Sequence, residues 1–156
     1  MKSTFSIFVV ILLCALFTTD MVAQQTWQWD AYKVKVDLPD DFKVTKNNDN
    51  EFEATGEGME LLMYIFEADI TLDEMKQATI DAAKDMELEE WDSVENITTR
   101  GFEGKYVAGY AEGSAVLLSG LINPKNITNF FVVVLFNDDD DVAEEAAFDI
   151  LDSIRK

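Results

Sequence analysis

Four consecutive aspartates, Asp138, Asp139, Asp140 and Asp141, are the residues whose type and spacing suggest chemistry most directly. They precede a segment whose apolar residues recur at helical spacing. Aspartates at a helix N-terminus accept hydrogen bonds from its unpaired amides and favour its dipole. We therefore interpret the run as a helix cap. The alternative is a calcium site, since clustered carboxylates suit hard cations, but the spacing lacks the glycine and the glutamate of an EF-hand loop.

The commonest catalytic side chains are missing from the sequence. The chain has no histidine, and its single cysteine, Cys14, lies in an apolar N-terminal segment. The usual zinc ligand sets and Ser-His-Asp or Cys-His catalysis are therefore excluded. A pair of carboxylates in a cleft remains as a route to hydrolysis, and Glu57 and Glu103 stand out because each lies beside glycine. Such acids are usually turn residues. We expect a non-enzymatic protein without a cofactor and keep a carboxylate-dependent hydrolase as the alternative.

Two tryptophans near the start of the expected domain, Trp27 and Trp29, are candidate partner-binding residues. Exposed tryptophans are common hot spots of protein interfaces. The alternative is that both side chains pack the N-terminal segment onto the domain.

The charge balance excludes nucleic acid as a partner. With 31 acidic and 12 basic residues among 156, the formal net charge is −19. The resulting negative field repels phosphate backbones and anionic lipid. Hydrophobic residues make up 48% of the chain, which is enough for one core and too many for an acidic disordered tail.

The first 23 residues have the order of a secretory signal peptide. Lys2 is followed by an apolar run over residues 5–17 and then by a polar stretch that leads to Ala23. The apolar run is too short to span a bilayer, which takes about 20 apolar residues. We therefore expect cleavage after Ala23, a single domain over residues 24–156 without membrane insertion, and a secreted or periplasmic location.

Eight segments have the apolar alternation or the apolar runs of β-strands. They cover residues 32–38, 42–45, 52–55, 60–66, 93–99, 105–111, 115–122 and 129–136. Residues 60–66 are apolar on both faces, which predicts a central strand. Residues 130–136 contain no polar side chain, so this strand must be covered on both faces.

Two further segments have helical periodicity. Thr71 and Glu74 have the spacing of a capping box, which predicts that a helix begins there and continues to Met86. The second helix follows the aspartate run and extends to Ile154. Two helices against one largely antiparallel sheet make an α+β domain.

The order of these elements, together with two short motifs, resembles the PsbP-like superfamily. The first motif ends a strand with Leu38-Pro39-Asp40-Asp41-Phe42, and the second ends the last helix with Ile150-Leu151-Asp152-Ser153-Ile154. The resemblance implies one antiparallel sheet covered by two helices, and a non-enzymatic accessory, assembly or binding role. The alternative fold is a cone of the nuclear-transport-factor-like type, which normally places its helices before its sheet.

These observations predict a secreted or periplasmic binding or accessory protein that has a protein partner. A structural component of an envelope assembly is a further alternative. The shape of the surface discriminates between the classes: a flat apolar surface favours a protein partner, whereas a deep concave site with two converging acids favours a hydrolase.

Overall fold

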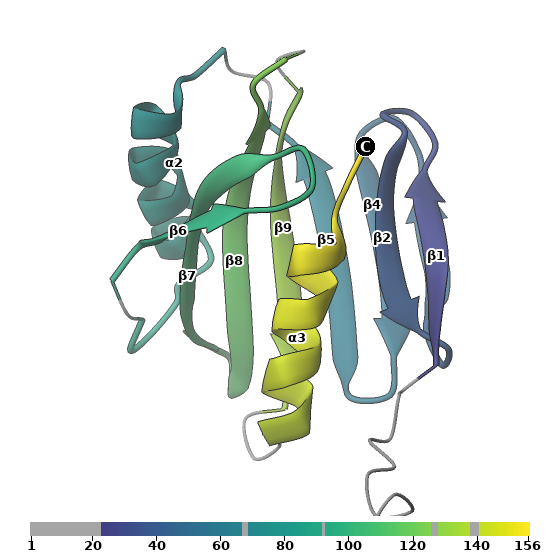
Figure 1. Ribbon diagram of the computed structural model, residues 1–156. Helices are drawn as coiled ribbons and strands as arrows, with labels where there is room; N and C mark the ends of the chain where they lie inside the picture. The colour runs from purple at the N-terminus through teal and green to yellow at the C-terminus, as the bar shows by residue number, and fades with distance from the viewer. Residues whose placement is uncertain (1–22, 67–68, 92, 126–127, 138–140) are drawn as a thin grey trace, which may run out of the picture.

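The computed structural model describes residues 23–66, 69–91, 93–125, 128–137 and 141–156, which form a single α+β domain (Figure 1). The strands are β1 (Gln24–Trp29), β2 (Val34–Pro39), β3 (Lys43–Asn47), β4 (Glu51–Gly56), β5 (Met59–Ile65), β6 (Glu95–Thr98), β7 (Glu103–Ala111), β8 (Ser114–Asn123) and β9 (Thr128–Phe136). The helices are α2 (Leu72–Asp85) and α3 (Asp141–Ser153).

Strand β9 is the centre of the main sheet. The seven strands are ordered β3-β4-β5-β9-β8-β7-β6, and every neighbouring pair is antiparallel. All residues of β9 except Thr128 and Leu135 are buried. The apolar run predicted to be covered on both faces is therefore the middle strand, with three strands on each side.

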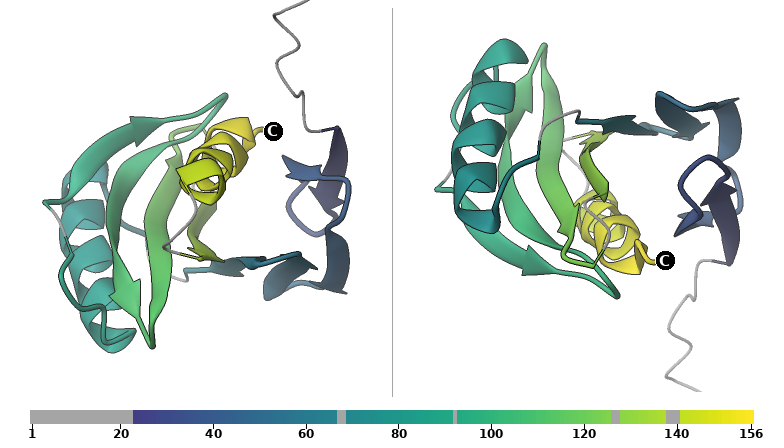
Figure 2. Two further views of the ribbon diagram at one scale, coloured as in Figure 1. Left: turned by 90° about the horizontal axis from the view of Figure 1, so that it is seen from below. Right: turned by 90° about the horizontal axis from the view of Figure 1, so that it is seen from above.

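Two apolar clusters cover the two faces of this sheet. On one face, α2 packs on β7 and β8. On the other face, α3 packs on β9 and β2, and the separate two-stranded sheet β1-β2 lies beyond α3. Figure 2 shows that the main sheet curves around α3, so this helix is enclosed between the sheet and the β1-β2 hairpin.

Two glycines allow the strands and α2 to approach closely. A Cβ atom at Gly104 of β7 would lie 2.0 Å from the carbonyl oxygen of Gly120 on β8. A Cβ atom at Gly120 would lie 2.3 Å from Met75 Sδ and 3.0 Å from Thr79 Oγ1 on α2. Met75 and Thr79 are both fully buried, so the helix is seated directly on the backbone of β8.

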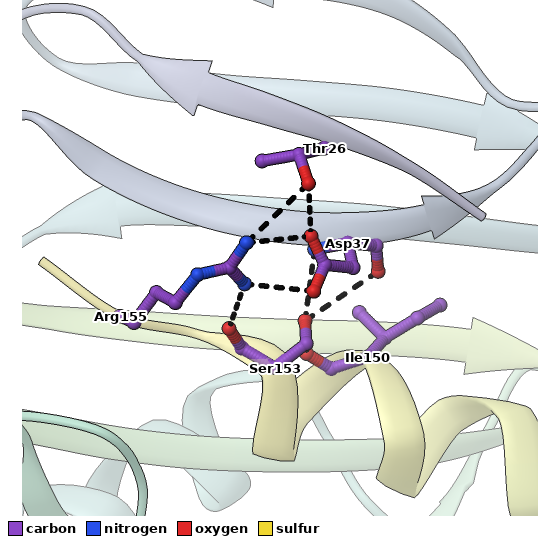
Figure 3. A network of polar contacts seen from close by, with 5 residues as sticks. All are labelled: Thr26, Asp37, Ile150, Ser153 and Arg155. Atoms are coloured by element: carbon purple, nitrogen blue, oxygen red, sulfur yellow. Dashed lines mark hydrogen bonds and ion pairs between the residues drawn. The ribbon is translucent and has the colours of Figure 1, made fainter.

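The C-terminal residues fasten the hairpin over α3 (Figure 3). The Arg155 guanidinium donates two hydrogen bonds of 2.8 Å to the two carboxylate oxygens of Asp37 on β2. Thr26 of β1 donates to the same carboxylate. The Ser153 hydroxyl accepts from the Asp37 N–H at 2.9 Å and donates to the Ile150 carbonyl at 2.7 Å. The end of α3 and both strands of the hairpin therefore share one polar network.

The observed elements confirm the predicted ones and add β1. The eight predicted strands correspond to β2–β9, and the capping box begins α2 as expected, with the Thr71 hydroxyl accepting from the Glu74 N–H at 3.4 Å. Strand β1 was not predicted because only Trp27 and Trp29 break its polar sequence. Residues 1–22 of the predicted signal peptide lie outside the described residues. The same holds for three of the four aspartates, Asp138, Asp139 and Asp140. In the described parts of the chain, neither helix is long and apolar enough to cross a membrane.

We expect Gly104→Ala to destabilise the protein by about 1–3 kcal/mol, because the added methyl group would meet a backbone carbonyl that cannot move aside without separating β7 from β8. The measurement is the free energy of unfolding in urea. Thr98→Ala, at an exposed position of the neighbouring strand β6, should change it by less than about 0.5 kcal/mol. Equal effects of both substitutions would contradict the close contact.

We expect Asp37→Asn to lower stability at neutral pH by about 1 kcal/mol and to make stability less sensitive to acid. Hydrogen bonding to Arg155 holds the pKa of Asp37 below its usual range, although partial burial opposes the shift. A carboxyl whose pKa is lower in the folded state stabilises the fold above its unfolded pKa, and this contribution disappears as the pH falls through the folded pKa.

The difference between wild type and Asp37→Asn should therefore shrink below about pH 4, as measured by urea unfolding between pH 2 and pH 7. Asp40→Asn makes the same charge change at an exposed position three residues away and should leave the acid sensitivity as in the wild type. A gap between wild type and Asp37→Asn that persists to pH 2 would show that the loss does not come from the ionised carboxylate.

Candidate functional site

A pocket of about 230 Å³ lies where α2 begins, and it contains one of the two acids singled out by the sequence. Its lining residues are Asp69, Ile70, Thr71, Leu72, Glu103, Ile122, Asn123 and Pro124. Glu103 and Asp69 are both exposed, whereas Asn123 is 6% exposed and accepts a hydrogen bond from the Lys125 N–H at 2.9 Å. The pocket therefore brings two carboxylates to one small concave site.

Thr71, which lines this pocket, also caps the N-terminus of α2. The backbone N–H of Thr71 donates to Glu74 Oε2 at 2.8 Å, and its hydroxyl lies 2.8 Å from the same oxygen. These hydrogen bonds lower the pKa of Glu74. A general acid, by contrast, needs a carboxyl shielded from water. Because Asp69 and Glu103 face solvent, the pocket suits the binding of a small polar group better than acid catalysis.

Glu57, the other acid singled out by the sequence, lies at the opposite end of the sheet. It occupies the turn between β4 and β5, where its N–H donates to Asp41 Oδ2 at 2.6 Å. The register places Met59 beside Phe136, near the start of β8, whereas Glu103 pairs with Ile122 near the end of β8. Glu57 and Glu103 therefore do not form a catalytic pair, and Glu57 is a turn residue as expected.

Trp29 is a core residue and not a surface anchor. Its side chain is fully buried, and its indole N–H donates to the Asn48 carbonyl at 2.6 Å. Its ring packs edge-on against Tyr32 and Phe130, with ring centroids 4.7 and 6.0 Å apart. Trp27 is half-buried and packs on the same core cluster. The burial of Trp29 confirms the alternative that these tryptophans pack the N-terminal segment onto the domain, and it rules out Trp29 as an exposed partner anchor.

The aspartate run is represented by Asp141, which is exposed and opens α3. Over the described ranges, no group of three or more acidic or cysteine side chains is arranged to hold a metal ion. The alternative of a calcium site at Asp138, Asp139 and Asp140 concerns residues that the structure does not describe.

The surface that the sequence did not single out is a half-buried apolar strip on β5 and β9, here called the β5 strip. It consists of Leu62, Tyr64, Phe66 and Leu135, all half-buried and all packed on the apolar cluster beneath α2. The opposite face of β5 carries Leu61 and Met63, which are fully buried. One face of β5 is thus buried at Leu61 and Met63, and the other is half-buried at Leu62 and Tyr64.

The strand register shows how the β5 strip is laid out. Leu62 lies between Val133 of β9 and Glu53 of β4, and Tyr64 lies between Phe131 and Glu51 in the same way. Directly opposed residues project to the same face of a sheet. The surface is therefore apolar toward β9 and acidic toward β4.

Aromatic contacts hold the lower part of the strip in place. The Tyr64 and Phe66 rings contact Phe131, with ring centroids 5.4 and 5.2 Å apart. Phe131 itself is 4% exposed. The Tyr64 and Phe66 side chains are consequently held in position by their contacts with the buried ring of Phe131.

Helix α2 borders the strip without covering it. The helix lies over β7 and β8 (Figures 1 and 2). Asp85 at its end raises the pKa of Tyr64, in addition to the larger effect of burial. Ala78 and Ala82 lie on the same side of the helix as Asp85 by the 3.6-residue repeat. This side of α2 therefore faces the β5 strip and presents small side chains and one carboxylate.

One signal in the sequence points to this surface in retrospect. Residues 60–66 are apolar on both faces, which predicts a strand covered twice. The strand is interior, as predicted, but the chain supplies a helix over only one part of that face of the sheet. Strand β5 therefore carries apolar side chains on a face that no helix of the described residues fully covers, and such a strand indicates a candidate interaction surface.

Comparisons with known proteins bear on the fold alone. No family model matches the sequence, and no curated protein is similar to it. A crystal structure from Bacteroides thetaiotaomicron VPI-5482, at 1.50 Å resolution, is similar with a TM-score of 0.51 and 8% sequence identity. The match covers 84% of this chain and 47% of that chain, so this chain spans about half the length of that protein.

We expect Asp85→Asn to lower the pKa of Tyr64 while leaving it above that of a free tyrosine, because burial is the larger cause of the shift. The measurement is an ultraviolet titration of tyrosine ionisation, with Tyr64→Phe used to assign the Tyr64 step. Asp81→Asn removes the same charge from an outward-facing position of α2 and should leave that step unchanged. An unchanged step in Asp85→Asn would mean that this side of α2 does not face the strip.

Proposed function

We propose that the protein is a secreted or periplasmic, non-enzymatic accessory protein that binds a protein partner through the β5 strip. The observation that carries the proposal is a partly covered face of an interior strand: Leu62, Tyr64 and Leu135 are half-buried beside the buried residues Phe131 and Val133. Contiguous apolar surface on an otherwise polar protein typically marks an interaction site. Leu62, Tyr64, Phe66 and Leu135 are neighbours on one face of the sheet, which supports the strip as such a site on a chain of net charge −19.

The PsbP-like character of the fold is part of the same proposal. Its support is that the two motifs behind the resemblance meet in space. Ser153 of the second motif bonds through its hydroxyl to the backbone of Asp37, next to Leu38 of the first. Leu38 and Ile154 are both fully buried in one cluster. The motifs thus form the joint between the hairpin and α3, which suits a scaffold role and supplies no reactive group.

The pocket at the start of α2 favours the alternative, a carboxylate-dependent hydrolase, because Asp69 and Glu103 share it. Both are exposed, and the pocket is small for a glycan or peptide substrate, since ligand sites typically have volumes of about 300–1,000 Å³. We therefore rank this function second.

We expect a photo-crosslinking amino acid at position 62 to give one discrete adduct with a second protein in the cells that export this chain. A partner helix or sheet seated on the strip would lie within contact distance of that position. The measurement is the appearance of a single higher-mass band after irradiation, identified by mass spectrometry.

The matched control places the same amino acid at position 142. Val142 is 67% exposed on α3, so it reports random encounters with neighbouring proteins. Absence of an adduct at 62, or the same adducts from both positions, would remove the support for partner binding through the strip.

A further inference from the structure

We propose that the partner element bound by the β5 strip is an amphipathic α-helix carrying lysine or arginine beside its apolar face. This inference rests on the proposed function and specifies its partner. Its basis is the position of α2, the dimensions of the strip and the charges that border it.

The position of α2 over β7 and β8 is compatible with a second helix beside it in the same layer. Neighbouring strands are about 4.8 Å apart, and packed helices are about 8–10 Å apart. A step of two strands from β7 and β8, which α2 covers, leads to β9 and β5. A helix placed there would therefore lie beside α2 at the normal spacing and contact the half-buried side chains of β5 and Leu135, since Phe131 and Val133 of β9 are already buried.

The β5 strip is long enough for a helix to pack along it, and small side chains lie beside it. From Leu62 to Phe66 the chain advances about 13 Å, which corresponds to between two and three helical turns. Ala78 and Ala82 line the side of α2 that faces the strip and are half-buried. Their small side chains permit close approach of a second helix, whose apolar residues at a spacing of three and four would meet Leu62, Tyr64 and Leu135.

The bordering charges select a basic helix. Asp85 lies on the α2 side of the strip, and Glu60 precedes Leu62 by two residues on the same face of β5. On the β4 side, Glu51 and Glu53 are bridged by Lys46, with N–O distances of 3.2 and 2.7 Å.

The local charge balance also argues against a second copy of this chain as the occupant. Lys46 and Lys43 are both on β3, two strands from β5, and Lys46 is engaged by its two glutamates. Asp85 and Glu60 thus dominate the border nearest the apolar side chains. Self-association through this face would oppose like charges on two chains of net charge −19, whereas a basic helix would satisfy both carboxylates.

The test uses the protein with three synthetic amphipathic peptides of about five helical turns, which share a leucine face and differ only in carrying lysine, glutamine or glutamate on the polar face. Binding is measured by fluorescence anisotropy at about 0.15 M salt, where charges beyond about 8 Å are screened. We expect the lysine peptide to bind about five- to tenfold more tightly than the glutamine peptide. The glutamate peptide should bind most weakly.

Variants separate the apolar and the charged contributions. Leu62→Ser should weaken both the lysine and the glutamine peptide by about tenfold. The double variant Glu60→Gln/Asp85→Asn should weaken only the lysine peptide, by about fivefold. The control Glu145→Gln/Asp152→Asn removes the same two charges from exposed positions of α3 and should change its affinity by less than about twofold. Amide chemical shifts of the wild type should move most on β5, β9 and α2, which tests the location without any variant.

Each contrary outcome has a separate meaning. Equal binding of the lysine and glutamine peptides would overturn the basic helix and leave partner binding through the strip intact. Equal effects of the two charge variants would assign lysine binding to the general negative field and overturn the inference in the same way. Shifts located elsewhere, or binding insensitive to Leu62→Ser, would overturn both this inference and the proposed function.

Discussion

The burial of β9 on both faces is the constraint on which the rest of the structure depends. A strand with the side chains Phe130, Phe131, Val132, Val133 and Val134 in succession exposes apolar surface in both directions. It is stable in water only inside a sheet whose two faces are covered. The chain satisfies this constraint by placing three strands on each side of β9, α2 on one face, and α3 with the β1-β2 hairpin on the other.

The two faces are covered to different degrees, and this difference creates the candidate site. On the α3 side, the curved sheet, α3 and the hairpin enclose the core cluster, and the polar network of Asp37, Ser153 and Arg155 joins them. On the α2 side, one helix serves a seven-stranded sheet and lies over two of its strands. The remaining strip on β5 and β9 stays half-exposed. The proposed function therefore rests on the α2 side of the sheet, where the β5 strip is only partly covered.

Several features of the fold and site were open to prediction because they follow from local rules. Alternation, apolar runs and the capping box of Thr71 and Glu74 located eight strands and two helices. Glu57 was correctly interpreted as a turn residue. Strand β1 was not predicted. Packing of Trp29 onto the domain was one of two interpretations, and the sequence could not decide between them because the residues that cover Trp29, in the β3-β4 turn and in β9, are distant in the sequence.

The sequence by itself determined the α+β class, the order of the elements and the strongly acidic character, because periodicity, capping and charge are properties of neighbouring residues. Only the tertiary structure decided which of these elements would face one another. Residues 60–66 specify a strand with two apolar faces, but whether a helix covers both faces depends on where α2 comes to rest. That position is set by Gly120, where the absence of a side chain lets Met75 and Thr79 approach β8. Packing between distant segments thus left the β5 strip open, and no local pattern contains that information.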